Sequence, residues 1–167
     1  MGELPTALFA WVERTPLALW VRESLWGFPI SLILHAWGMA LLVGISLLLA
    51  LSTLGVAPRA LLPLAEKSKP FIWAAFILSL VSGVLLLFAY PAKALTNEVF
   101  YLKLAFIAVA MTLDVSLINK SRELATPHET PFPPRLKLRA AGILLAWFGA
   151  IAAGRLLAYT YSILTVT

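Results

Sequence analysis

The feature that most constrains this chain is an uncharged run of about 30 residues, from Gly27 to Val56 (GFPISLILHAWGMALLVGISLLLALSTLGV). A helix needs only ~20 apolar residues to cross the hydrocarbon of a bilayer. A helix that is apolar on every side must also be hidden from water on every side. The run therefore predicts a transmembrane helix, and it carries one imidazole, His35, about two turns from its start.

Composition supports the membrane class and narrows the function. Hydrophobic residues make up 61% of the 167 residues and charged residues 13%, which leaves a soluble domain short of polar surface. The net charge of +5 does not indicate nucleic acid, because Lys and Arg lie in loops beside apolar runs. The absence of Cys excludes disulfides and thiolate sites. No GxSxG, HExxH or P-loop motif occurs, so no catalytic residue is predicted and enzyme activity is left open.

Four spans are expected, at residues 27–56, 71–90, 99–117 and 138–163. Small residues recur every four positions in two of them, which allows a neighbouring helix to approach closely. These stripes are Ala75, Ser79 and Gly83 in the second span, and Ala146, Ala150 and Gly154 in the fourth. We predict an all-α, integral membrane four-helix bundle that forms a single membrane domain over residues 1–167.

The first 26 residues have a different character. Residues 5–25 are expected to form two short helices broken at Pro16, with Thr15 as the N-cap of the second. Trp11, Trp20 and Trp26 alternate with charged residues, as in segments that lie among lipid headgroups. Residues 1–26 are thus expected to be an interfacial amphipathic segment; the alternative is a lead-in that only packs on the bundle.

The loop charges predict the orientation. Four spans put both termini and the 91–98 turn on one side, and the 57–70 and Pro-rich 119–137 loops on the other. Lys and Arg number three on the first side (Arg14, Arg22, Lys93) and eight on the second (Arg59, Lys67, Lys69, Lys120, Arg122, Arg135, Lys137, Arg139). Because Lys and Arg collect in cytoplasmic loops, both termini are predicted to face away from the cytoplasm, which in a bacterial inner membrane is the periplasm. The four Tyr residues form an aromatic belt at the same outer end (Tyr90, Tyr101, Tyr159, Tyr161).

Polar groups inside the spans indicate a site, since such groups are costly in a bilayer and usually face the bundle interior. At 1.5 Å per residue, His35 and Arg155 both lie ~10 Å below the outer surface. Lys103 enters from that side at a shallower depth, and Tyr159 is one turn from Arg155. Gly38, on the His35 face, is expected to leave room for a flat or bulky guest. His35, Gly38, Lys103, Arg155 and Tyr159 are therefore the predicted cofactor-binding residues.

The predicted cofactor is a b-type haem or a quinone. Imidazole is a common axial ligand of haem, which makes His35 the candidate metal ligand, and buried cations could hold propionates or a quinone oxygen. His128 lies in the cytoplasmic loop, so a second axial ligand would be Met111, a residue of another subunit, or absent. Copper held by His35 and Met39, at i and i+4, is an alternative. Another is that His35 is a hydrogen-bonded core residue that ties helices together.

Three other polar residues have separate expectations. Asp114 lies near the inner end of its span, within reach of Lys137 or Arg139. Lys103 is either part of the predicted site or a residue that extends its ammonium to the outer surface. His128, within TPHET, is expected to be a solvated loop residue.

Two stretches, FPISLILHAWGMALLVG (28–44) and AWFGAIAAGRLLAY (146–159), carry a resemblance. They resemble a family of small bacterial four-helix membrane proteins catalogued as a domain of unknown function. The shared pattern includes His35, Gly38, Gly44, Gly154, Arg155 and Tyr159 and extends over nearly the whole chain. The first half is more loosely similar to the copper-resistance D type of membrane protein. The resemblance implies the architecture and no particular reaction.

The function expected from these observations is that of an inner-membrane subunit that takes part in electron transfer. It would contact membrane lipids and either other membrane subunits or further copies of itself, and no nucleic acid. The alternative is a non-catalytic structural or assembly subunit of a larger membrane complex, in which the polar residues hold helices together.

Overall fold

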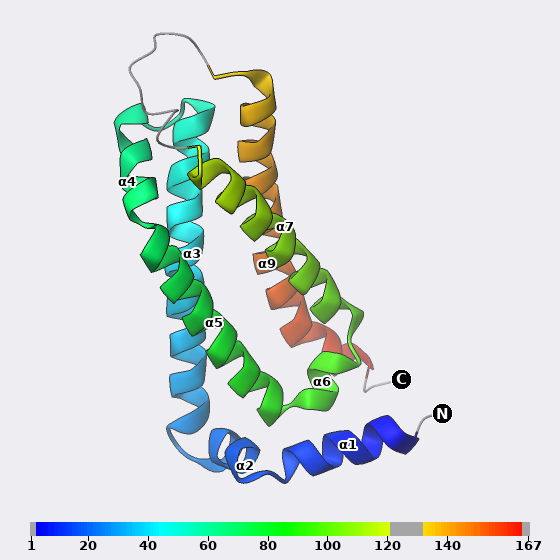
Figure 1. The fold of residues 1–167 in the computed structure, drawn as a ribbon. Helices are drawn as coiled ribbons and strands as arrows, with labels where there is room; N and C mark the ends of the chain where they lie inside the picture. The colour runs from blue at the N-terminus through cyan, green and yellow to red at the C-terminus, as the bar shows by residue number, and fades with distance from the viewer. Residues whose placement is uncertain (1–2, 121–131, 165–167) are drawn as a thin grey trace.

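The computed structural model describes residues 3–120 and 132–164, and the elements in these ranges are helices (Figure 1). The four long helices are α3 (Gly27–Leu54), α5 (Lys69–Ala89), α7 (Glu98–Ile118) and α9 (Pro134–Leu164). The shorter elements are α1 (Glu3–Glu13), α2 (Pro16–Glu23), η1 (Arg59–Leu61), α4 (Leu62–Lys67) and α6 (Pro91–Leu95). Each long helix is long and apolar enough to cross a membrane. The predicted all-α architecture with four spans is confirmed.

The ends of the long helices follow local chemistry. Gly55, with φ of 85°, caps α3 in the left-handed conformation that glycine adopts without a steric penalty. Helix α9 begins at Pro134, four residues before the predicted span, because proline is well suited to the first turn of a helix. Asn97 caps α7, and its side-chain amide donates to Thr160 Oγ1 at 2.8 Å, which joins the ends of α7 and α9.

The N-terminal segment forms the two short helices that the sequence predicts. The Thr15 hydroxyl accepts a hydrogen bond from the Ala18 amide at 3.3 Å, so the expected N-cap is present. Ala18 and Val21 are fully buried where α2 packs on α5 and α3, whereas Trp11 and Trp20 are exposed. Figure 1 shows α1 and α2 lying across the end of the bundle at which both chain ends are found. The segment therefore packs on the bundle with one face and leaves its tryptophans uncovered.

The bundle consists of two helix pairs. Helix α3 packs most extensively on α5, and α7 on α9; the contact between α3 and α9 joins the pairs, and α3 hardly touches α7. The sequence places Ser31, Gly38, Met39, Leu42 and Ser46 on the His35 face of α3, which is predicted to be interior; all but the partly buried Met39 are buried. A Cβ added to Gly38 would lie 2.8 Å from the Ser79 amide nitrogen and 2.9 Å from the Ala75 carbonyl oxygen. The small-residue stripe of α5 is therefore where the α3 backbone approaches closely, as predicted.

The outward faces of the long helices are apolar. Large hydrophobic side chains stand exposed along them, among them Trp37, Phe71, Leu80, Leu145 and Phe148. Uncovered apolar surface on this scale is unusual for a soluble monomer and suits contact with lipid chains. The architecture thus fits a multi-pass membrane protein.

Candidate functional site

His35 is held on α5 through one ring nitrogen. Its Nδ1 lies 2.9 Å from the Ser79 carbonyl oxygen and 3.3 Å from the Ser82 hydroxyl. A carbonyl oxygen can only accept, so Nδ1 carries the proton and donates to Ser79. This tautomer leaves Nε2 with a free lone pair, and no described residue donates to it. The half-buried imidazole therefore offers one fixed acceptor atom.

The His35 ring lies close to α5 at Gly83. A Cβ added to Gly83 would lie 3.2 Å from Cε1 and 3.4 Å from Nδ1 of His35, which is closer than most real contacts. The imidazole therefore contacts three residues of α5, which are Ser79, Ser82 and Gly83. The position of Nε2 is thus determined by α5 as well as by α3.

Lys103 brings a cation to the same level from the other helix pair. It is half-buried on α7, and its stem passes over Gly154 of α9, whose added Cβ would lie 3.7 Å from Lys103 Cε. Its ammonium makes no hydrogen bond or ion pair within residues 3–120 and 132–164. One helix pair therefore carries a free acceptor nitrogen and the other an unpaired donor.

Gly38 does not have the role that the sequence suggested. The expectation that it leaves room for a guest is wrong, because the space beside its Cα is filled by the backbone at Ala75 and Ser79. Gly38 contributes to the site indirectly, since it allows α5 to come close enough for His35 to reach the Ser79 carbonyl.

Arg155 and Tyr159 are not joined to His35 by any contact in the described parts of the chain. Arg155 is exposed, and no residue described here bonds to its guanidinium. Tyr159 is 63% exposed. The position of α9 that meets Lys103 is Gly154, and Arg155 projects ~100° further round the helix.

Met111, the other candidate axial ligand on this chain, lies far from His35. Met111 is buried in the hydrophobic core and lies eight residues beyond Lys103, ~12 Å deeper along α7. It is therefore too far from the His35 level to act as a second axial ligand. The described residues contain no group of three His, Cys, Asp or Glu side chains that could hold a metal ion. His128 lies outside the described residues.

A second polar centre surrounds Asp114. Its Oδ2 lies 2.6 Å from Ser46 Oγ on α3 and accepts from Trp147 Nε1 of α9 at 3.0 Å. The expected partners of Asp114 are wrong: Arg139 donates instead to Ser116 Oγ at 3.2 Å, and exposed Lys137 makes no contact with the carboxyl. The aspartate is fully buried because it lies where α3, α7 and α9 meet.

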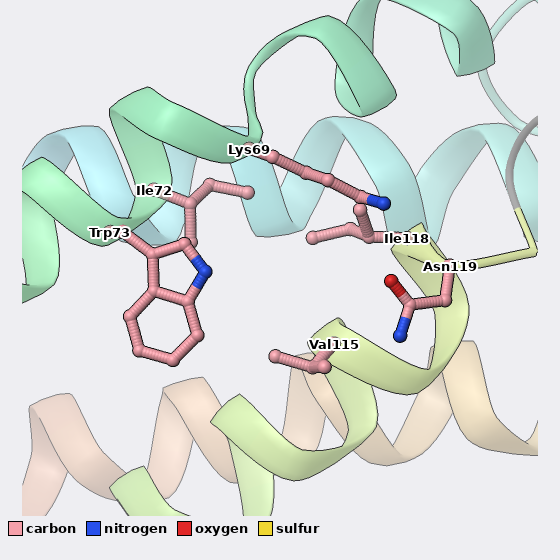
Figure 2. A pocket seen from close by; sticks show the side chains of 6 residues that line it. All are labelled: Lys69, Ile72, Trp73, Val115, Ile118 and Asn119. Carbon is pink, nitrogen blue, oxygen red and sulfur yellow. The ribbon is translucent and has the colours of Figure 1, made fainter.

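One small cavity lies between α5 and α7, with a volume of about 40 Å³. Figure 2 shows the side chains of Lys69, from the start of α5, and Asn119, from the end of α7, reaching toward it, with Trp73 on the side opposite Asn119. The remaining lining residues are Ile72, Val115 and Ile118. Lys69 begins α5, so the cavity lies at the end of the bundle remote from the chain termini and contains none of the predicted site residues.

The hydrogen-bond partners of His35 and Asp114 that were not predicted from the sequence are Ser79, Ser82, Ser46 and Trp147. A usable signal existed for two of them. Ser79 belongs to the small-residue stripe, and Trp147 lies in the middle of a span, away from the membrane interfaces where tryptophan is usually found.

Comparison of the chain with protein-family models, curated proteins and solved structures finds no match. The resemblance to the four-helix family of unknown function therefore stays a prediction.

Proposed function

We propose that this chain is a membrane subunit of an electron-transfer system and binds a quinone between its two helix pairs, at His35 and Lys103. The observation that carries the proposal is that two polar groups of the membrane-spanning helices, Nε2 of His35 and the ammonium of Lys103, have no partner among the described residues. A polar group left unpaired in hydrocarbon costs several kcal/mol, so both groups favour a guest that satisfies them.

A quinone satisfies Lys103 in its oxidised state and both groups in its reduced state. Its carbonyl oxygens accept a hydrogen bond from the Lys103 ammonium. The quinol, formed when the quinone takes up two electrons and two protons, has hydroxyl groups that donate to the free Nε2 of His35. The electrons would come from a redox group of a partner subunit, which agrees with the expectation of other membrane subunits as partners.

Haem b is a second candidate, favoured by one specific observation. A ring Nδ1–H that donates to a backbone carbonyl is the usual way in which proteins orient a metal-binding histidine and make its other nitrogen a better ligand. His35 would supply one axial bond, and the described chain supplies no other at that level. Quinone fits better because it also uses Lys103.

The test is binding of a short-tailed quinol, kept reduced by excess reductant, to the protein purified in mild detergent, followed by quenching of tryptophan fluorescence. His35→Leu and Lys103→Met should each weaken binding by about tenfold, the loss of one hydrogen bond to a charged or fixed group. Lys137→Met, exposed at the other end of the bundle, is the matched control and should bind as the parent does. Equal binding by all four proteins would overturn the proposal.

An absorption spectrum of the protein isolated with any partner subunits separates the two cofactors. A Soret band abolished by His35→Ala would replace quinone by haem. With neither haem absorption nor quinone binding, the structural or assembly subunit becomes the better account, and the polar residues serve to hold helices together.

We further propose that the protein resides in a bacterial inner membrane with both termini in the periplasm. The support is the three-to-eight distribution of Lys and Arg, together with the location of both chain ends at one end of the bundle (Figure 1). A reporter that is active only in the periplasm, fused to the C-terminus, should be active. Activity of a cytoplasm-specific reporter instead would reverse the orientation.

A further inference from the structure

Asp114 is the only aspartate in the sequence, and it lies in the most enclosed part of the bundle. Ser46, Trp147 and Asp114 are each 0–1% exposed, and they come from three different helices. Of the two carboxyl oxygens, Oδ2 has both partners, while Oδ1 is buried and has none. An ionised carboxylate here would be a charge without a counter-ion and with one oxygen unsatisfied.

No charge from the surrounding helices compensates the carboxyl. It is fully buried, and its hydrogen-bond contacts among the described residues are with Ser46 and Trp147. The titratable and charged residues on the three helices around it do not bond to it in the described structure. They are His35 on α3, Glu98, Tyr101 and Lys103 on α7, and Arg135, Lys137, Arg139, Arg155 and Tyr159 on α9.

The hydroxyl of Ser46 gives an independent indication of the protonation state. Its Oγ lies 2.9 Å from the Leu42 carbonyl oxygen and 2.6 Å from Asp114 Oδ2. A hydroxyl has one proton and can make only one strong donation. If Ser46 donates to the Leu42 carbonyl, as serines in helices commonly do four residues back, the contact with Oδ2 needs a second proton.

We propose that Asp114 is a proton-binding site inside the membrane, with a proton on Oδ2 that is donated to Ser46 Oγ. The chain of donors then runs from Asp114 to Ser46 and on to the Leu42 carbonyl. The carboxyl is neutral, so its unpaired Oδ1 is a carbonyl oxygen rather than a buried charge. This greatly reduces the cost of enclosing the group.

The proton-binding site is separate from the quinone site. Ser46 is 11 residues beyond His35 on α3, a distance of ~16 Å along the helix. The two proposals therefore rest on different residues, and either can fail without the other.

A carbon-13 label in the aspartate side chain reports this one carboxyl, because the chain contains no other aspartate. The protein is made by cell-free synthesis with the labelled amino acid, reconstituted in lipid, and followed by NMR as a function of pH. We expect the carboxyl carbon to have the chemical shift of a protonated acid at pH 7. The same labelled chain unfolded in denaturant should show an ionised carboxylate at that pH, which is the internal control.

Two outcomes would overturn the proposal. One is an ionised Asp114 carboxylate in the folded protein at pH 7. The other is a chemical shift that responds to sodium chloride and not to choline chloride, which would make the site one for a small metal cation. Ser46→Ala gives a further check on the donor chain: the carboxyl signal should shift, since the hydroxyl that receives its proton has been removed.

Discussion

The two polar centres of this bundle differ in how fully they are enclosed by the helices. Around Asp114 the partners come from the chain itself, and the carboxyl, a serine and a tryptophan are enclosed where three helices meet. Around His35 one ring nitrogen is fixed on α5, while the other and the Lys103 ammonium have no partner in the described chain. The comparison teaches that polarity within a span has two distinct uses. A closed centre stabilises the bundle, whereas an open one has unused hydrogen-bonding capacity for a ligand.

The largest effect on stability is expected from Gly38→Leu, because Gly38 lies where α3 contacts α5 close to His35. A side chain there would meet the α5 backbone at Ser79 and Ala75, and backbone atoms cannot move aside as a flexible side chain can. We expect a loss of about 3 kcal/mol in the free energy of unfolding, together with loss of quinone binding. The measurement is thermal or denaturant unfolding in detergent.

Gly44→Leu is the matched control on the same helix. A Cβ added to Gly44 has nothing within 4 Å, so the variant should keep its stability or gain up to about 1 kcal/mol from better helix propensity. Equal damage from both glycine substitutions would show that α3 tolerates no added bulk, and that the close approach at Gly38 has no special importance.

Trp147→Phe is expected to have the next largest effect, because it opens the closed centre. The substitution removes the donor to Asp114 Oδ2 and leaves a small void in a fully buried place. The expected loss is about 2 kcal/mol in the free energy of unfolding, with quinone binding unchanged. Trp37→Phe, at a position 65% exposed, should change stability by less than about 0.5 kcal/mol. If quinone binding fell in Trp147→Phe without loss of stability, the two centres would not be separate.

Lys103→Met should show the opposite pattern. The ammonium stabilises nothing in the described structure, so its removal should change the free energy of unfolding by less than about 0.5 kcal/mol while it weakens the binding of quinone. A strong loss of stability would mean that Lys103 belongs to a closed centre like that of Asp114, and that the open centre does not exist.

Sequence reasoning recovered the architecture well because its signals are local. Uncharged runs longer than a bilayer is thick, a stripe of small residues and a Thr15–Pro16 cap each act over a few turns. The hydrogen-bond partners of the polar residues were much harder to predict, because they depend on how each helix is rotated about its axis relative to its neighbours. The depth count placed Arg155 and His35 at one level, yet depth does not say which side of α9 faces inward, and Gly154 takes the inward position instead. Asp114 was assigned to distant cations for the same reason: the proximity of Ser46 and Trp147 arises only when three helices meet.

Gly83→Ala is expected to have the smallest effect on ligand affinity. It tests how strongly that affinity depends on the position of the His35 ring. The added methyl would lie 3.2 Å from Cε1 of the His35 ring, so the ring must shift by a few tenths of an ångström. The Nδ1 hydrogen bond to the Ser79 carbonyl can adjust to such a shift, and the expected change in unfolding free energy is therefore only about 0.5 kcal/mol. Nε2, which is bonded to Cε1, moves with it relative to Lys103, and quinol affinity should fall two- to fivefold. Gly142→Ala, whose added Cβ would lie 3.1 Å from the end of the Leu113 side chain, applies similar crowding away from His35 and should leave affinity unchanged. If both alanine variants bound quinone as the parent does, the affinity would not depend on the position of the imidazole, and His35 would be better described as one more residue that ties α3 to α5.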